Sequence, residues 1–154
     1  MAKALILTDN TSLEFGAPRY LGPYRIADEL EKLGIKTTVI DHFFSFPDIL
    51  GLIEKIIDDS YLIVGISSTF MTPPAVSGHK RTGRTLDYFS SAVVHRDNSE
   101  ILNWFSKLKS IVRKKSPAAK IFLGGTKASR FLDPPLNSCA DIDFLVLGAA
   151  DSAF

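Results

Sequence analysis

Residues 61–70 read Tyr-Leu-Ile-Val-Gly-Ile-Ser-Ser-Thr-Phe, an apolar and largely β-branched run that ends in small hydroxyl residues. A run this short, with no alternation of polar and apolar residues, is typical of a strand covered on both faces, as in a parallel sheet. In open parallel sheets, ligands bind beyond the carboxyl ends of the strands, where the strand order reverses. Ser67, Ser68 and Thr69 are therefore candidates for lining a ligand site. The alternative is that they simply end the strand.

Strands and helices are predicted to alternate on either side of this stretch. Short apolar runs predict further strands at residues 3–8, 35–41, 120–123 and 142–147. Apolar residues at helical spacing predict helices over residues 22–33 and 48–59, and a third from residue 98 or 99 to the stop at Pro117. Gly34 is placed to cap the first helix. This alternation predicts an α/β fold of the flavodoxin-like (Rossmann-type) class, a three-layer sandwich around a five-stranded parallel sheet of order 2-1-3-4-5.

Length and composition indicate one soluble domain. The chain has 154 residues, of which 45% are hydrophobic and 23% charged, and its formal net charge of +1 gives no general reason to expect nucleic acid or an anionic membrane as partner. No signal peptide is evident, so a cytoplasmic location is expected. Residues 71–97 form an unusually long connection, in which residues 86–94 are a candidate extra strand. Residues 1–154 are expected to be the N-terminal domain, or a truncated fragment, of a longer protein.

Three loops are expected to meet at one edge of this sheet. In the 2-1-3-4-5 order the first and third strands are neighbours at the switch point, and the fourth lies beside the third. The loop after the first strand, the hydroxyl residues after the third and the glycines after the fourth then converge. The predicted cofactor-binding residues are Asp9, Asn10, Thr11, Gly16, Ser67, Ser68, Thr69, Gly124, Gly125 and Thr126.

Several other chemistries fit less well. A phosphorylatable aspartate is missing at the end of the third strand, where Ser67 and Ser68 stand, so phosphotransfer is excluded. A flavodoxin-type phosphate loop around Thr8 and Asn10 stays open as a minor alternative. The spacing of His42, His79 and His95 defines no metal site, and the single cysteine, Cys139, cannot form an internal disulfide or a multi-cysteine cluster. No catalytic residue and no metal ligand is predicted.

These three loop signatures resemble cobalamin (vitamin B12)-binding domains, in particular those at the N-terminus of radical SAM enzymes. The resemblance covers nearly the whole chain, including residues 148–151, Gly-Ala-Ala-Asp, which look like a degraded form of the Gly-x-Gly-Glu that closes such domains. It implies that Gly124 and Gly125 let the backbone approach a large flat ring. It also implies that the hydroxyls of residues 67–69 bond the dimethylbenzimidazole tail or the propionamide groups.

The sequence departs from the wider cobalamin-binding pattern at the first loop. Mutases and methionine synthase carry Asp-x-His-x-x-Gly there, with the histidine on the lower face of cobalt, whereas this chain has Asp9-Asn10-Thr11 and no histidine. By the resemblance, cobalt would lack a protein histidine below it, or no cobalamin would be bound. The Cys-x-x-x-Cys-x-x-Cys motif of radical SAM enzymes is also missing from the 154 residues. S-adenosylmethionine, a 4Fe-4S cluster, and methyl transfer or related radical chemistry would therefore belong to a downstream radical SAM domain or a separate catalytic chain.

A second hypothesis keeps the fold without the cofactor. The basic group Lys80, Arg81 and Arg84 lies on the long connection, and such residues on a glycine-containing loop can follow a nucleic-acid backbone. The domain would then act in protein or nucleic-acid interaction through this insertion. The missing histidine and the altered segment 148–151 favour this alternative.

Overall fold

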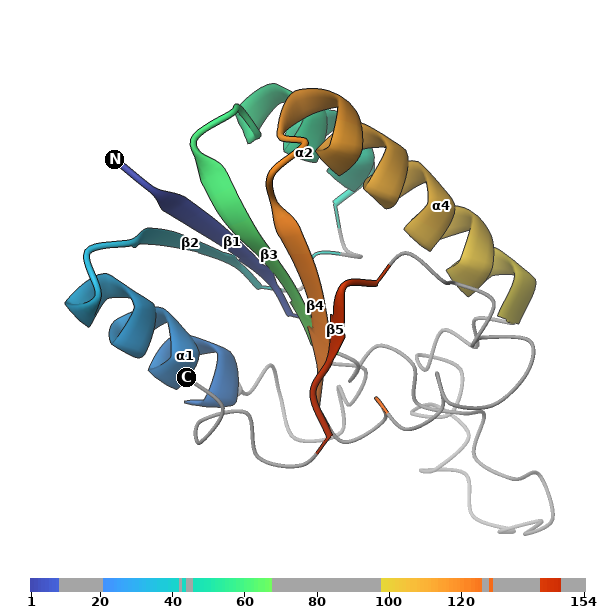
Figure 1. Ribbon diagram of the computed structural model, residues 1–154. Helices are drawn as coiled ribbons and strands as arrows, with labels where there is room; N and C mark the ends of the chain where they lie inside the picture. The colour runs from blue at the N-terminus through green and yellow to red at the C-terminus, as the bar shows by residue number, and fades with distance from the viewer. Residues whose placement is uncertain are drawn as a thin grey trace, which may run out of the picture.

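The computed structural model confirms the predicted α/β fold and strand order. It describes residues 1–8, 21–41, 43, 46–67, 98–125, 128 and 142–147, with the backbone alone for residues 98–101. Five parallel strands form one sheet in the order β2-β1-β3-β4-β5 (Figure 1). The strands are β1 (Lys3–Leu7), β2 (Lys36–Ile40), β3 (Tyr61–Ser67), β4 (Lys120–Gly124) and β5 (Phe144–Leu145). The helices are α1 (Leu21–Lys32), α2 (Ile49–Ile56) and α4 (Asn98–Lys115).

Helices cover both faces of the sheet. Figure 1 shows α1 on one face and α2 and α4 together on the other. The larger core lies under α2 and α4, where buried residues such as Leu5, Val64 and Leu123 meet Phe105 and Leu108 of α4. The smaller core lies under α1 and is built around four buried residues: Ala4, Ile6, Ala27 and Leu30. Because both faces of the central strands are covered, these strands are apolar throughout, as the sequence indicated.

Local signals fix the ends of the first two helices. Gly34 has φ +79°, and the N–H of Ile35 donates to the carbonyl of Leu30 while the N–H of Gly34 donates to that of Glu31. This is a Schellman cap, and it confirms the predicted role of Gly34. At the start of α2, the Asp48 side chain accepts a hydrogen bond from the N–H of Gly51 at 2.9 Å. A Cβ at Gly51 would lie too close to this carboxylate, so the Asp48 side chain would have to shift to admit any other residue there.

Two elements are shorter than the sequence predicted. Helix α2 ends at Ile56, before the predicted Asp59, because Ile57 is extended (ψ 129°) and the Asp58 carboxylate then accepts the N–H of Ser60 in a turn that leads into β3. Strand β5 covers only Phe144–Leu145, whereas residues 142–147 were predicted. Its ladder starts late because the N–H of Ile121 is bonded to the side chain of Asp143.

The remaining predictions for local structure lie on residues that the structure does not describe. They are the candidate extra strand at residues 86–94 and the whole connection at 71–97. Within the described helices, no segment is both long and apolar enough to cross a membrane.

Candidate functional site

The carboxyl ends of the three central strands place Thr8, Ser67 and Gly124 in one row. Leu7 of β1 pairs with Ile66 of β3, so Thr8, the next residue, lies level with Ser67. Ser67 in turn pairs with Gly124 of β4. The expectation that residues after the third and fourth strands come together is therefore confirmed for Ser67 and Gly124. The start of the first loop joins them through Thr8.

The row lies on the face of the sheet that α1 covers. Side chains two residues apart on a strand share a face, so Thr8 lies on the face of Ala4 and Ile6, which pack under α1. By the same rule Ser67 lies on the face of Ile63, which packs against that core. Gly124 pairs with Ser67 and shares its face. A ligand that contacts this row would approach from the α1 side.

Thr8 has a fully satisfied backbone and an unsatisfied side chain. Its N–H donates to the carbonyl of Ile40 at 3.0 Å, and its carbonyl accepts the N–H of Phe43 at 3.2 Å. The residue is 0% exposed. Its hydroxyl Oγ1 is also buried and has no hydrogen-bond partner within the part of the chain that the structure describes. A buried hydroxyl without a partner costs about 1–3 kcal/mol, so its presence calls for an explanation, such as a bound water, ion or ligand.

Asp41 extends the row by one position on the side of β2. Leu7 pairs with Ile40, so Asp41 stands level with Thr8, between the two residues that bond the Thr8 backbone. The Tyr24 hydroxyl of α1 donates to Asp41 Oδ2 at 3.1 Å, which holds this carboxylate on the α1 side. Asp41 is only partly buried. The row therefore combines one carboxylate, two hydroxyls and one glycine.

The two glycines at the end of β4, Gly124 in the strand and Gly125 after it, differ in their backbone conformation. Gly125 has φ +101°, a conformation that other residues rarely adopt, and its carbonyl accepts the N–H of Ala128. Glycine is required there whether or not a ligand binds. Gly124 has no such strain, and a Cβ there would meet Val146 Cβ at 3.5 Å, an ordinary contact. Substitution of Gly124 is therefore the more informative test of ligand approach.

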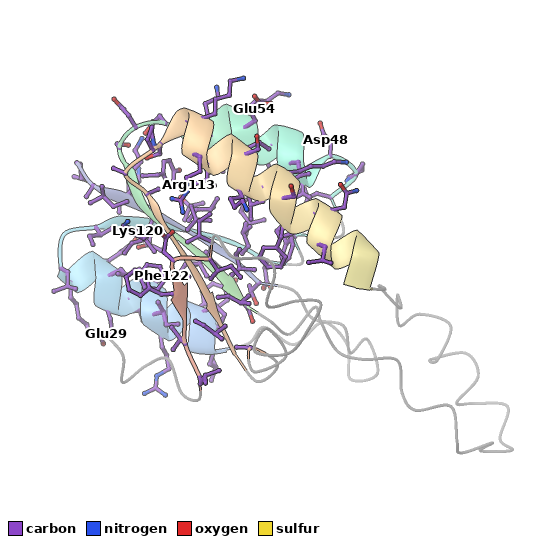
Figure 2. All side chains as sticks on the ribbon, turned by 45° about the vertical axis from the view of Figure 1, so that its right-hand side comes forward. Glu29, Asp48, Glu54, Arg113, Lys120 and Phe122 are labelled. Atoms are coloured by element: carbon purple, nitrogen blue, oxygen red, sulfur yellow. The ribbon has the colours of Figure 1, made fainter. Side chains whose placement is uncertain are left out.

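The opposite side of the sheet, where the amino ends of the strands lie, is called the amino edge. It holds a hydrogen-bond network centred on Asp143. Its Oδ2 accepts hydrogen bonds from Arg113 and from the N–H of Ile121, both at 2.7 Å, and Lys120 lies 3.6 Å from Oδ1. Arg113 also donates to the carbonyl of Ala119. Partial burial raises the pKa of Asp143, but the Ile121 hydrogen bond and the Arg113 guanidinium outweigh it, so this pKa lies below its ordinary value. Figure 2 shows Arg113 reaching from α4 toward the start of β4, where Lys120 lies.

Two further contacts close the amino edge. Lys3 pairs with Asp58 at 2.8 Å, and Asp58 also accepts hydrogen bonds from the N–H and hydroxyl of Ser60. These bonds, that from Lys3 first, lower the pKa of Asp58 to about 2. The buried Ser116 hydroxyl donates to the carbonyl of Tyr61 at 2.6 Å. The polar side chains of Asp58, Ser116 and Asp143 thus have partners within the protein and act in structure.

Most residues predicted for the site lie outside the described residues. They are Asp9, Asn10, Thr11, Gly16, Ser68, Thr69 and Thr126, together with the three histidines and the basic group Lys80, Arg81 and Arg84. Sequence reasoning did not include Asp41, although its acidic side chain at the end of the predicted strand 35–41 was a usable signal. Thr8 had been considered only for a phosphate loop.

Comparisons with known proteins assign no family to this chain. No family model matches it, and a search of curated proteins finds no match. Among the described side chains, no group of three or more histidine, cysteine or acidic residues is arranged to hold a metal ion.

Proposed function

We propose that this chain is a cobalamin-binding module of a radical SAM enzyme, with catalysis carried out by a separate downstream domain or chain. The observation that carries the proposal is the buried Thr8 hydroxyl, which has no partner among the described residues and lies at the switch point of a flavodoxin-like sheet. Ligands of this fold class bind at that point. We choose cobalamin as the ligand because the loop sequences resemble those of cobalamin-binding domains.

The described residues of the row are compatible with this ligand. Thr8 and Ser67 carry hydroxyls that can bond the amide groups or the nucleotide tail of cobalamin, and Gly124 adds no side chain between them and β5. Bound cobalamin would supply a cobalt centre able to carry a methyl group. The chain itself would bind and orient the cofactor, and S-adenosylmethionine and the 4Fe-4S cluster would be held by the catalytic partner.

A titration with hydroxocobalamin tests the proposal. The visible spectrum should shift on binding, and the cofactor should co-elute with the protein in gel filtration. Thr8→Val keeps the shape of the side chain and removes the hydroxyl. We expect it to weaken binding about three- to tenfold, the value of one hydrogen bond. Gly124→Ala tests the same row by adding a methyl group on the α1 side.

Ser116→Ala is the matched control, because it removes a buried hydroxyl at the opposite edge of the same sheet. It should leave the affinity for hydroxocobalamin unchanged in the folded protein. Absence of any spectral change at millimolar hydroxocobalamin would refute the proposal. Equal affinity of the native protein and Thr8→Val would remove the observation that carries it.

The absence of a histidine from the first loop favours one alternative, a cofactor-free domain that acts in protein or nucleic-acid interaction through residues 71–97. Its test is a mobility shift with single-stranded RNA or DNA at two salt concentrations. A salt-dependent shift that disappears on replacing Lys80, Arg81 and Arg84 by alanine, with no response to hydroxocobalamin, would support this function instead.

A further inference from the structure

One half of the sheet face that α1 covers has no described helix over it. Helix α1 packs against β2 and β1, and on that face the described helices leave β4 and β5 open (Figure 1). Phe122 of β4 lies on this face, two residues before Gly124, and is only partly buried. On the opposite face of the same strand, Ile121 and Leu123 are buried under α2 and α4. The α1 side of β4 and β5 is therefore the more exposed side.

This open half holds an aromatic projection beside a hollow. Gly65 of β3, Phe122 of β4 and Phe144 of β5 pair in register and form what we call the β3–β5 patch. The rings of Phe122 and Phe144 are stacked with centroids 4.7 Å apart, and Phe144 is 49% exposed. The described atoms within 4 Å of a Cβ placed at Gly65 are Ile6 Cγ1 at 3.6 Å and the Leu5 carbonyl oxygen at 3.9 Å. These are ordinary contacts, so a methyl group would fit above Gly65 without displacing the sheet.

Neither the backbone nor the packing of β3 requires a glycine at position 65. The described glycines with positive φ are Gly34 and Gly125, and Gly65 is not one of them. A glycine in a strand interior costs about 0.5–1 kcal/mol relative to alanine, and such a residue often marks the close approach of another backbone or a ligand. The hollow above Gly65 therefore points to an occupant above the sheet.

A surface that carries both a projection and a hollow is complementary to a copy of itself. In a two-fold interface, each contact from one copy to the other occurs twice. Phe144 and Gly65 lie on either side of β4, two strand spacings or about 10 Å apart. A two-fold axis parallel to β4 places Phe144 of each copy above Gly65 of the other. Sheets that pack face to face are about 10 Å apart, a depth into which an aromatic side chain reaches.

This arrangement also leaves room for α1. Helix α1 lies over β1 and β2, whereas β5 of the other copy would lie above β3. Helix α1 of each copy then stands beside β5 of the other copy, which is the last strand of the described sheet. Edge strands benefit from such cover, because their unpaired N–H and C=O groups otherwise invite further pairing.

We infer that the β3–β5 patch is the interface between two copies of this chain, related by a two-fold axis parallel to β4. The patch spans three strands, so each copy buries less than the roughly 800 Å² of a standard interface. The dimer is therefore weak, with a dissociation constant on the order of 100 μM. Ser67 and Gly124 lie two residues further along their strands, at the margin of the interface. The inference does not depend on the proposed function, and its test contains no cofactor.

Sedimentation velocity at neutral pH and physiological ionic strength, over protein concentrations from about 10 μM to about 1 mM, measures the association. We expect the native protein to shift from monomer to dimer over this range. Phe144→Asp places a charge in the interface and should leave the protein monomeric throughout. Gly65→Ala fills the hollow with a methyl group and should raise the dissociation constant about fivefold or more.

Phe46→Asp is the matched control. Phe46 is 44% exposed, close to the value of Phe144, but it lies on the connection that leads into α2, outside the patch. This variant introduces the same charge and should dimerise like the native protein. Far-ultraviolet circular dichroism and urea denaturation check that each variant is folded. Gly65→Ala, which the single chain accommodates, keeps the test decisive if Phe144→Asp does not fold.

A native protein that stays monomeric up to about 1 mM overturns the inference, and a helix of a different protein then remains as the occupant of the patch. A dimer that persists unchanged in folded Gly65→Ala and Phe144→Asp overturns it as well, because the interface would lie elsewhere. Weakening of the dimer in both patch variants, with its retention in Phe46→Asp, supports it.

Discussion

The amino edge of the sheet and the carboxyl edge, where the strands end, differ in the hydrogen bonding of their buried hydroxyl groups. At the amino edge, Ser116 is buried and its hydroxyl donates to the carbonyl of Tyr61. At the carboxyl edge, Thr8 is equally buried and its hydroxyl has no partner within the described residues. The acidic side chains of the amino edge are also bonded within the protein, because Asp143 and Asp58 are each held by a basic side chain and by one backbone N–H group.

This difference indicates that the hydroxyl at the amino edge contributes to stability, whereas the one at the carboxyl edge lowers it. A protein of this size is stable by only a few kcal/mol, and an unsatisfied buried hydroxyl uses a noticeable part of that margin. Polar groups that the fold itself does not use are expected at functional sites. Changing one edge at a time tests this contrast.

The largest effect is expected from Asp143→Ala at the amino edge. The change removes a carboxylate that accepts hydrogen bonds from Arg113 and from the N–H of Ile121. These two bonds join α4 and β4 to the start of β5. We expect the free energy of unfolding to fall by about 1.5–3 kcal/mol, the range for hydrogen bonds to a charged group. Urea denaturation measures the change.

Glu54→Gln is the control for Asp143→Ala. The Glu54 carboxylate lies 3.7 Å from the Lys114 ammonium group, and both side chains are more exposed than those of Asp143 and Arg113. Glu54→Gln should therefore alter stability by less than about 0.5 kcal/mol. Figure 2 shows Glu54 on α2, beside α4. An equal loss in the two variants would mean that the Asp143 network is an ordinary surface pairing.

Ser116→Ala should be the next most damaging change. It deletes the donor to the Tyr61 carbonyl and leaves a small void, so the free energy of unfolding should fall by about 1–2 kcal/mol. The measurement is again urea denaturation. A neutral result would show that water replaces the hydroxyl and that the amino edge is less tightly closed than its contacts indicate.

Thr8→Val should change stability in the opposite direction. Valine has nearly the same shape and removes a buried polar atom that lacks a partner in the described chain, so the ligand-free protein should gain about 1 kcal/mol. A loss of stability in urea denaturation would reveal a hydrogen bond to Thr8 from residues outside the described set. A gain in stability together with weaker cofactor binding would show that the Thr8 hydroxyl lowers stability and serves ligand binding.

The smallest effect is expected in the pH dependence of stability, through Asp58. The pKa of Asp58 is lowered from 3.8 to about 2, so its contribution to stability is present above pH 4 and is lost as the pH falls toward 2. Asp58→Asn should therefore flatten the dependence of unfolding free energy on pH between about 4 and 2. An unchanged slope in Asp58→Asn would contradict the role of the Lys3 and Ser60 bonds.

The sequence was sufficient for the fold because its strongest signals are local. Unbroken apolar runs mark the buried strands, helical spacing marks α1, α2 and α4, and Gly34 marks the end of α1. The strand order then follows from right-handed crossovers. The ends of α2 and β5 were placed wrongly because side chains decide them. Asp58 bonds to Ser60 after α2, and Asp143 bonds to Ile121 before β5.

The sequence predicted where in the sheet the candidate site lies, but not the hydrogen bonding of its side chains. Topology brings Ser67 beside Gly124, and this required no knowledge of side-chain contacts. Whether a given hydroxyl is satisfied depends on atoms distant in sequence, as Ser116 and Tyr61 show across 55 positions. No pattern of residues distinguishes Thr8 from Ser116 in this respect. The role of Gly125 likewise emerged from its backbone conformation, which the sequence alone left open.

The anchoring of Thr8 has one more consequence. Its main-chain N–H donates to Ile40 and its carbonyl accepts from Phe43, so the end of β1 is tied to β2 without the use of the Thr8 side chain. A substitution of that side chain leaves both hydrogen bonds in place. The chemistry presented at this position can therefore change while the backbone of the sheet keeps its course.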